Sequence, residues 1–341
     1  MELYFLGTAA GAPARERNVS SVALRFDQGR AIWLFDCGEG TQHQILRAPF
    51  STAQITHIFI THLHGDHLFG LPGLLSTRSL QGGEDRPLTV LGPVGIAAYL
   101  RACLDASSTR LGYDLRIAEL SVPAAGSAPA PRTPPESPRM AATPPVPASE
   151  RVAEWPTALE DDDVCVRYAP LRHGVTSLGY AIKERDKPGR FRLERARDQG
   201  VPAGPLYGKL KRGETVTLPD GRVLRGEDFT EAAVPGRKVV ILGDTTPCAA
   251  SVSLAADADA LVHEATFSRA HAELAGARRH STAADAARTA EKAGAGTLIL
   301  THVSPRYQGA QGEEELLADA REIFPNTLLA RDHWSWRVTG R

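Results

Sequence analysis

The sequence predicts a layered α/β protein, and three observations lead to that prediction. Apolar runs rich in β-branched and aromatic residues alternate with segments of helical pattern, which is typical of sheets covered by helices. Polar clusters follow four of the predicted strands, at residues 61–67, 243–245, 263–266 and 301–304. Two segments, 122–150 and 184–234, differ in composition from the rest and interrupt the alternation. We therefore expect one large α/β domain over residues 1–341 with two additions.

The amino-terminal half contains the first group of elements. Their apolar patterns predict strands at 2–6, 21–26, 31–35, 55–60 and 88–91, and helices at 39–46, 69–80 and 94–104. Asp36 ends the third strand. It serves equally well there as a turn residue or as a hydrogen-bond partner of a metal ligand.

The carboxyl-terminal half repeats the pattern of strands that end in polar residues. Strands are expected at 164–171, 177–183, 237–242, 260–262 and 297–300. His280-Ser281-Thr282 opens a helix, because Thr282 and Asp285 match a capping box.

Composition narrows the classes of protein. The net charge of −1 excludes an overall basic nucleic-acid coat, and the four cysteines form no Cys-x-x-Cys pair. No apolar run is long enough to span a membrane, and the acidic amino terminus does not resemble a signal peptide, so we expect a cytoplasmic protein. Nine of the 24 prolines fall within 123–147, which predicts a disordered insertion over 122–150.

The densest polar cluster is Thr61-His62-Leu63-His64-Gly65-Asp66-His67, directly after the strand at 55–60. Imidazole and carboxylate groups suit zinc, and four such groups this close together can serve two ions a few Å apart. The alternative is a set of solvated or core histidines, which would leave adjacent buried polar groups without partners. The pattern resembles the signature of the metallo-β-lactamase superfamily of binuclear metal hydrolases.

Three further strand ends complete two coordination spheres. His62, His64 and His173 would hold one ion, Asp66, His67 and His302 the other, and Asp244 would bridge both. A hydroxide between the ions would supply the nucleophile, since metal binding lowers the pKa of water to about 7.

His280 and Glu264 have no metal to hold in this arrangement. A histidine paired with a carboxylate can protonate a departing oxygen, and Asp66 can take the proton of the attacking water. The alternative is that Glu264 only supports a ligand and that His280 only starts a helix.

The motif set resembles that of the ribonuclease Z family of tRNA 3′-processing endoribonucleases. The resemblance covers nearly the whole chain and includes every metal ligand. It is carried, in order, by residues 13–18, 62–67, His173, 243–245, 263–266, 280–282, 300–304 and 306–309. It implies RNA contacts at Arg15, Arg17, Asn18, Thr245, Ser281, Thr282, Gly204, Pro205, Lys209, Lys211 and Arg212.

The stretch 183–212 carries ten Lys or Arg against four acids. A run of charge like this is usually a solvated surface segment. It resembles the flexible arm of the family, with its Gly-Pro element at Gly204-Pro205 and an extent here of 184–234. That resemblance implies an arm that grips the tRNA body, and a homodimer in which one subunit's arm serves the other's site.

Two features depart from the family pattern. Arg15 stands where lysine is usual, which affects how the loop places the cut, and the proline-rich insertion is extra.

We expect an αβ/βα sandwich of two face-to-face sheets with helices outside, two Zn²⁺ ions per subunit, and cleavage of precursor tRNA to a 3′-hydroxyl and a 5′-phosphorylated trailer. Manganese shares the same ligands. The alternatives are a small-molecule phosphodiesterase, thioesterase or lactamase of the same superfamily, or a tRNA-binding module without catalysis.

Overall fold

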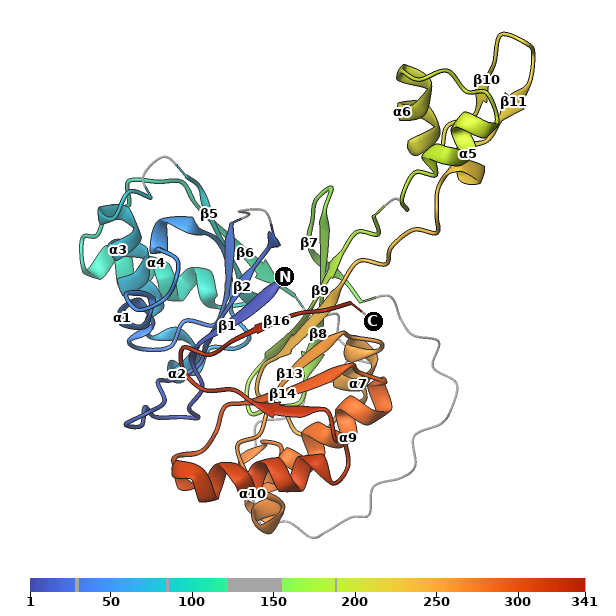
Figure 1. The fold of residues 1–341 in the computed structure, drawn as a ribbon. Helices are drawn as coiled ribbons and strands as arrows, with labels where there is room; N and C mark the ends of the chain where they lie inside the picture. The colour runs from blue at the N-terminus through green and yellow to red at the C-terminus, as the bar shows by residue number, and fades with distance from the viewer. Residues whose placement is uncertain (28–30, 84–85, 122–154, 188, 341) are drawn as a thin grey trace.

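A computed structural model describes residues 1–27, 31–83, 86–121, 155–187 and 189–340 of the chain. The insertion expected at 122–150 lies outside the described residues. The described part forms two seven-stranded sheets that face each other, with helices on both outer faces (Figure 1). No helix within the described ranges is both long enough and apolar enough to cross a membrane.

The first sheet is built mainly from the amino-terminal half and has the strand order β16-β1-β2-β3-β4-β5-β6. Its strands β3 to β6 are parallel, and β16, β1 and β2 add antiparallel pairs at one side. The strands are β1 (Glu2–Gly7), β2 (Ser21–Arg25), β3 (Ile32–Phe35), β4 (Ile55–Phe59), β5 (Leu88–Pro93), β6 (Leu115–Leu120) and β16 (Ser335–Arg337).

The second sheet has the order β15-β14-β13-β12-β9-β8-β7. Strands β12 to β15 are parallel, whereas β7, β8, β9 and β12 pair antiparallel. The strands are β7 (Thr157–Glu160), β8 (Val164–Leu171), β9 (Ser177–Glu184), β12 (Lys238–Leu242), β13 (Ala260–Glu264), β14 (Thr297–Thr301) and β15 (Thr327–Leu329).

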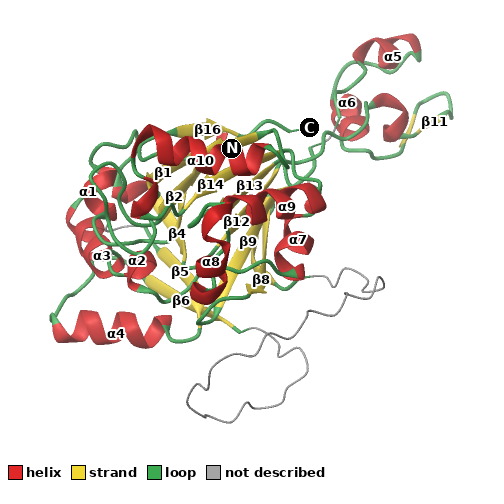
Figure 2. Ribbon diagram, turned by 90° about the horizontal axis from the view of Figure 1, so that it is seen from below, coloured by secondary structure: helices red, strands yellow, loops and turns green. Residues whose placement is uncertain are grey.

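Helices cover each sheet on its outer face, so that the fold has four layers (Figures 1 and 2). The first sheet is covered by α1 (Thr41–Ile45), α3 (Leu71–Leu80) and α4 (Ile96–Ala106). The second is covered by α7 (Ala249–Ala255), α9 (Ala283–Ala293) and α10 (Gly309–Arg321), while α8 (Ala272–Arg278) precedes α9. Thr282 caps α9 with Asp285 in the predicted capping box.

Three apolar cores hold these layers together. The central core lies between the sheets and includes Phe35, Phe59 and Tyr180, and each sheet buries a second core under its helices. Burial of this area is the main source of stability. The expected αβ/βα sandwich is confirmed.

One local expectation was wrong. The sequence predicted a helix that starts at residue 69, but Asp66 and His67 already lie on a helical turn, α2 (Gly65–Leu68), and α3 begins at Leu71. The break falls at Gly70, whose backbone packs so closely on the chain at Gly38 that a Cβ would stand 2.0 Å from its carbonyl oxygen. Only glycine permits that approach.

The segment predicted as an arm projects away from the sandwich (Figure 1). It contains α5 (Leu193–Asp198), α6 (Pro205–Lys211) and a short hairpin of β10 (Val216–Thr217) and β11 (Val223–Leu224). It has a small core of its own, formed by Ala196, Val201, Leu210, Val216, Leu218 and Phe229. The arm is therefore a folded unit rather than a simple hairpin.

Candidate metal centre

The candidate metal centre lies at the edge of the sandwich where strands of both sheets end. Strand β4 leads into the first histidines, α2 carries the next two side chains, and β8, β12 and β14 each deliver one more. Because the carboxyl ends of parallel strands meet at one edge, residues distant in sequence converge there. The structure brings together all seven predicted ligands: His62, His64, Asp66, His67, His173, Asp244 and His302.

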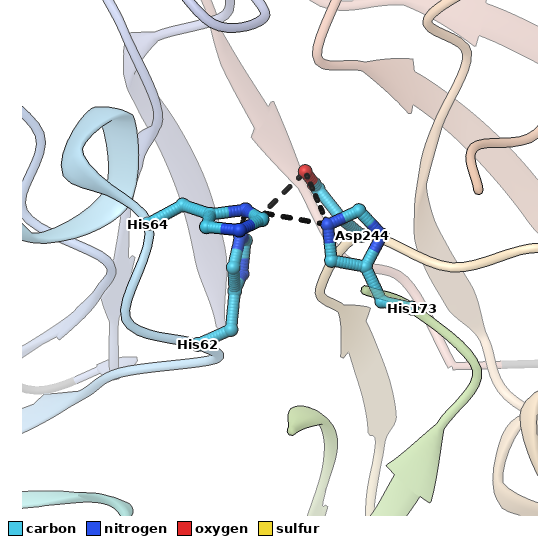
Figure 3. Close-up of side chains that lie close together, drawn as sticks. All are labelled: His62, His64, His173 and Asp244. Carbon is cyan, nitrogen blue, oxygen red and sulfur yellow. Dashed lines mark hydrogen bonds and ion pairs between the residues drawn. The ribbon is translucent and has the colours of Figure 1, made fainter. Parts of the chain in front are cut away.

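The first group comprises His62, His64, His173 and Asp244, which point toward one another (Figure 3). The Nδ1 atom of His64 lies 3.0 Å from Nε2 of His62 and 3.3 Å from Nε2 of His173. Oδ2 of Asp244 lies 3.7 Å from His62 Nε2 and 4.0 Å from His173 Nε2. These four atoms surround one point.

The second group comprises Asp66, His67 and His302, with Asp244 between the two groups. Nε2 of His67 lies 3.2 Å from Nε2 of His302 and 3.4 Å from Oδ2 of Asp66. Asp244 approaches this group through Oδ1, 3.5 Å from His67 Nε2, and through Oδ2, 3.4 Å from His302 Nε2. A carboxylate in this place can contact ions on both sides.

The spacing of the donor atoms fits small divalent cations. Zinc binds nitrogen and oxygen at about 2.0–2.1 Å, so neighbouring ligand atoms in a tetrahedral site lie roughly 3.3 Å apart. Most donor pairs in both groups are within a few tenths of an ångström of that spacing. The cluster of histidine and aspartate side chains can therefore hold metal ions.

Hydrogen bonds on the outer side of the rings orient His67 and His62. Nδ1 of His67 lies 2.7 Å from Oδ2 of Asp36, and since a carboxylate only accepts, this nitrogen carries the proton. The Thr61 hydroxyl donates to Asp36 over 2.9 Å and so accepts from Nδ1 of His62 over 3.0 Å. Both rings therefore direct Nε2 inward, toward the other donor atoms. Of the two roles open to Asp36, the structure supports that of ligand partner.

The same arrangement holds on the side of the second sheet. Nδ1 of His173 donates to the carbonyl oxygen of Arg279 over 2.8 Å. The Thr266 hydroxyl donates to Glu264 over 2.6 Å and therefore accepts from Nδ1 of His302 over 2.8 Å. Four of the five predicted histidine ligands are thus fixed with Nε2 free for an ion.

The charges at the site favour cations. Burial alone raises the pKa of Asp66, but hydrogen bonds and charge from His302 and His67 outweigh it and lower that pKa below its ordinary value. Burial lowers the pKa of His67, yet the carboxylates of Asp244 and Asp36 overcome it and raise the pKa. Positive charge is needed to balance these carboxylates.

Glu264 and His280 form the predicted pair beside this centre. Glu264 is buried, and its two oxygens lie 3.1 and 3.2 Å from Nδ1 of His280. Burial opposes both charges, but the contact lowers the pKa of Glu264 and raises that of His280. His280 also lies near Asp244 and His302. Its Nδ1 already donates to Glu264, so this nitrogen is not free to bind an ion.

Three residues predicted to touch RNA are buried instead. Thr245, Ser281 and Thr282 are each no more than 2% exposed. The backbone N–H groups of Thr245 and Ser281 donate to Glu264, and the Ser281 hydroxyl donates to the carbonyl of Thr245. Thr282 caps α9. The structure thus favours a supporting role for these residues: Thr245 and Ser281 hold the carboxylate that orients His280, and Thr282 starts the following helix.

The three RNA contacts predicted in the amino-terminal loop, Arg15, Arg17 and Asn18, also differ in their exposure and partners. Arg15 is exposed, whereas Arg17 is 5% exposed and pairs with Glu313 at 2.5 Å. The Asn18 amide donates to the carbonyl of Glu39 over 2.8 Å. Arg17 and Asn18 therefore anchor the loop, and Arg15 is the member of the three that faces solvent.

The predicted arm contacts are distant from the metal centre. Gly204, Pro205, Lys209, Lys211 and Arg212 are exposed and lie on or next to α6. Arg212 pairs with Glu214 at 2.7 Å, whereas Lys209 and Lys211 form no ion pair within the described residues. Over 184–234 the chain has eleven Lys or Arg and nine Asp or Glu, so the positive charge is concentrated in the first half, around α5 and α6.

An open cavity of about 420 Å³ gives access to the metal centre. Arg278 and Arg306 line it beside His64, His173 and His280. Sequence reasoning did not name these arginines as site residues, although Arg306 lies within the motif at 306–309. A larger cavity of about 720 Å³ lies at the outer face of β8, β9 and β12. Among the described residues its lining contains no metal-ligand cluster, so we place the chemistry in the smaller one.

The fold and site first define a class of protein. The structure is similar to the metallo-β-lactamase fold protein YhfI of Bacillus subtilis, with a TM-score of 0.61 at 16% identity over 98% of each chain. A family model described as anti-Pycsar protein Apyc1 matches residues 1–108. The chain has the metallo-β-lactamase fold.

Full-length relatives then define the family. Ribonuclease Z of Brevibacillus brevis is 47% identical over 97% of this chain and 95% of its own length, and that of Acaryochloris marina is 46% identical over 100% and 98%. Human tRNase Z, short form, gives a TM-score of 0.67 at 28% identity over 99% of this chain and 100% of its own. The chain belongs to the ribonuclease Z family.

Proposed function

We propose that this protein is an endoribonuclease that removes the 3′ trailer from precursor tRNA. The observation that carries the proposal is the complete cluster of seven donor side chains beneath an open cavity, in a chain that matches ribonuclease Z over its full length. Hydrolysis would break the bond between phosphorus and the 3′ oxygen of the tRNA. The products are a tRNA 3′-hydroxyl and a trailer with a 5′-phosphate.

Two divalent cations per subunit are part of this proposal, zinc in the first place and manganese as a substitute with the same ligands. His62, His64 and His173 would hold one, Asp66, His67 and His302 the other, and Asp244 would contact both. When bound, such ions lower the pKa of water and stabilise charge on a phosphate group.

The remaining side chains would handle protons. The N–H of Gly11 donates to Oδ2 of Asp66 over 2.8 Å, which holds this carboxylate toward the cavity, where it can accept a proton from the attacking water. Glu264 holds His280 through Nδ1, so that Nε2 is left to donate a proton to the departing 3′ oxygen. Both side chains are therefore assigned catalytic roles.

The arm at 184–234 is assigned to substrate binding, as a projection of the single domain at 1–341. The arm leaves β9 at Glu184 and returns to β12 at Lys238, whereas the metal centre lies at the opposite ends of these strands, next to Ser177 and Leu242. Eight residues of strand span roughly 27 Å. This separation supports a homodimer in which the arm of one subunit holds RNA for the site of the other.

A precursor tRNA substrate also supports a cytoplasmic location.

Three arginines would contact the RNA near the scissile phosphate. They are Arg15, on the solvent side of its loop, and Arg278 and Arg306, which line the cavity.

The test is cleavage of a 3′-extended precursor tRNA by the wild-type protein, by Asp66→Ala and by the exposed control Asp114→Ala, with both product ends mapped. We expect wild type and Asp114→Ala to cut near the discriminator nucleotide and leave a 5′-phosphate on the trailer. Asp66→Ala should not cut.

Two other outcomes would replace the proposal. A wild-type protein that leaves the tRNA intact but hydrolyses an aryl phosphodiester would be a small-molecule phosphodiesterase. One that binds the tRNA, takes up well under about two ions and hydrolyses neither substrate would be a binding module.

A further inference from the structure

The two ends of the arm are joined to each other where they leave the sandwich. The guanidinium of Arg237 donates to both carboxylate oxygens of Glu184, each over 2.7 Å. The N–H of Glu184 donates to the carbonyl of Arg237 over 2.9 Å. The side chain of Arg237 is only 14% exposed and that of Glu184 only 12%. A paired, bidentate contact of this kind fixes direction as well as distance.

Arg237 also ties this joint to the other sheet. It donates to Oδ2 of Asp27 over 2.9 Å and to the carbonyl of Val338 over 3.3 Å. Asp27 follows β2 of the first sheet, and its Oδ1 lies 3.3 Å from the amino group of Met1 and 3.7 Å from Arg337. One guanidinium therefore connects both ends of the arm, which belong to the second sheet, with the edge of the first sheet.

Backbone packing makes the joint tight. A Cβ on Gly236 would stand 1.9 Å from the carbonyl oxygen of Glu184, so the two ends cross at van der Waals contact. Farther out, Lys187 and Val234 exchange two backbone hydrogen bonds of 2.9 Å. Beyond this ribbon the arm stands clear of the sandwich in both views (Figures 1 and 2).

This geometry makes the arm a lever. The returning side of the ribbon, residues 230–236, pairs with the outgoing side at Thr230 and Val234. Seven extended residues span roughly 23 Å, so a rotation of about 10° at the joint would move the arm by about 4 Å. RNA held on the arm must still place one phosphate at the metal centre. RNA held on a loosened arm must first be brought back to that angle, which adds an ordering cost to the binding step and weakens binding.

We propose that Arg237 and Glu184 are positioning residues, which lock the arm at the angle that lets bound precursor tRNA reach a metal centre. The proposal rests on the function proposed above. Neither residue is near the seven metal-ligand side chains, so the effect on RNA cleavage is transmitted through the arm.

The side chains of Arg237 and Glu184 are both charged at neutral pH. Burial alone raises the pKa of Glu184, but hydrogen bonds and charge from Arg237 lower it below its ordinary value. The contact therefore persists throughout the neutral range.

The test compares Arg237→Ala, Glu184→Ala and the control Arg116→Ala, which breaks an exposed 2.8 Å pair with Asp114 elsewhere on the surface. For Arg237→Ala and Glu184→Ala we expect the KM for precursor tRNA to rise about tenfold with little change in kcat. Hydrolysis of an aryl phosphodiester should stay at the wild-type rate in all three. Unchanged KM values in both would overturn the proposal.

The two variants also separate positioning from direct RNA contact. If Arg237 only attracted RNA, then Glu184→Ala would remove a nearby negative charge and lower KM. The proposal requires KM to rise in both. The double variant should be no worse than the single ones, because both residues act through one contact.

Hydrogen exchange supplies a readout that does not depend on cleavage. We expect faster exchange in residues 185–192 and 229–236 of both variants, while the strands of the sandwich keep their protection. Unchanged exchange there would contradict the proposal, even if Arg237→Ala were too unstable to assay, since Glu184→Ala can be measured alone. If the wild type does not cleave precursor tRNA, the proposed function fails. Faster exchange in the two variants would still show that the contact between Arg237 and Glu184 holds the base of the arm.

Discussion

The metal centre and the arm are built in opposite ways. At the metal centre, side chains from both sheets are buried or half-buried, and His62, His67, His173 and His302 are each held by a hydrogen bond to Nδ1. On the arm, the charged side chains are exposed and pair mainly with neighbours in sequence, such as Arg212 with Glu214. Chemistry requires atoms fixed to within fractions of an ångström, whereas attraction of a polyanion requires charge at a suitable distance.

The two regions also lie at opposite ends of β9 and β12. Changes at the centre should therefore affect every substrate, and changes in the arm should affect RNA alone. The following predictions test this division.

The largest effect is expected from loss of a metal ligand. His64→Ala, or treatment with a chelator, should lower kcat/KM for precursor tRNA and for an aryl phosphodiester by about 10³-fold or more, because the ions contribute several kcal/mol to the transition state. Added Zn²⁺ or Mn²⁺ should restore the chelated wild type. His43→Ala, an exposed histidine on α1, is the control. A variant without this ligand that still hydrolysed either substrate would contradict the assignment of the chemistry to the metal centre.

A smaller effect is expected from Glu264→Gln. The carboxylate accepts from the N–H groups of Thr245 and Ser281, and an amide nitrogen in either place would face a donor. We expect kcat to fall about 10–100-fold on both substrates, as for the loss of other groups that orient a site. Steady-state kinetics on both substrates, with the exposed Glu273→Gln as control, check this. A loss confined to RNA would contradict it.

Removal of exposed charge from the arm should affect RNA alone. In a Lys209→Gln, Lys211→Gln double variant we expect KM for precursor tRNA to rise severalfold. The slope of log K against log salt should become shallower by about 0.9 for each lost phosphate contact. Lys292→Gln on α9 is the control for loss of an exposed lysine from the sandwich. If the aryl substrate responded as well, the arm would not be separate from the chemistry.

The smallest effect on activity is expected from Glu313→Gln. Burial raises the pKa of Glu313, but hydrogen bonds from Arg331 and Arg17 lower it overall. A carboxyl with a lowered folded-state pKa stabilises the fold fully above its unfolded pKa of about 4.5, and that contribution is lost progressively as the pH falls through the folded-state pKa.

At neutral pH, loss of these charge-assisted bonds should therefore cost about 1–3 kcal/mol in the free energy of unfolding. Urea unfolding at pH 7 and pH 3 checks the sign, because the difference between wild type and variant should shrink in acid. A difference that grew in acid would contradict this explanation.

Much of the fold and nearly all of the candidate metal site could be predicted from local sequence patterns. The strand at β4 followed by His62, His64, Asp66 and His67 specifies both the element and its chemistry, since such a cluster has few other uses. The ends of β8, β12 and β14 could be assigned to the same edge because of the strand pattern and the family resemblance.

Other features depend on contacts that sequence does not display. Burial of Arg17 follows from Glu313, nearly 300 residues away, so an arginine in a motif loop could not be recognised as an anchor. Thr245 and Ser281 are likewise turned inward by Glu264. The edge strands β7, β15 and β16 have only three or four residues each, too few for a clear periodic pattern.

The arm shows the same limit. Its basic composition was evident, but its core around Leu210 comes from residues scattered between Ala196 and Phe229. The joint of Glu184 with Arg237 spans 53 positions and is visible only once the strands β9 and β12 are paired.

The most direct test of the division is a protein without the arm. Residues 191–230 can be replaced by Asn-Gly, because the carbonyl of Arg190 accepts from the N–H of Glu231 over 2.8 Å and a two-residue turn closes such a pair. We predict that kcat/KM for precursor tRNA falls about a hundredfold or more, as when one of two linked binding sites is lost. The rate on an aryl phosphodiester should stay at the wild-type value. If both rates fell together, or if cleavage of the tRNA were unchanged, recognition and chemistry would not be divided between the two regions.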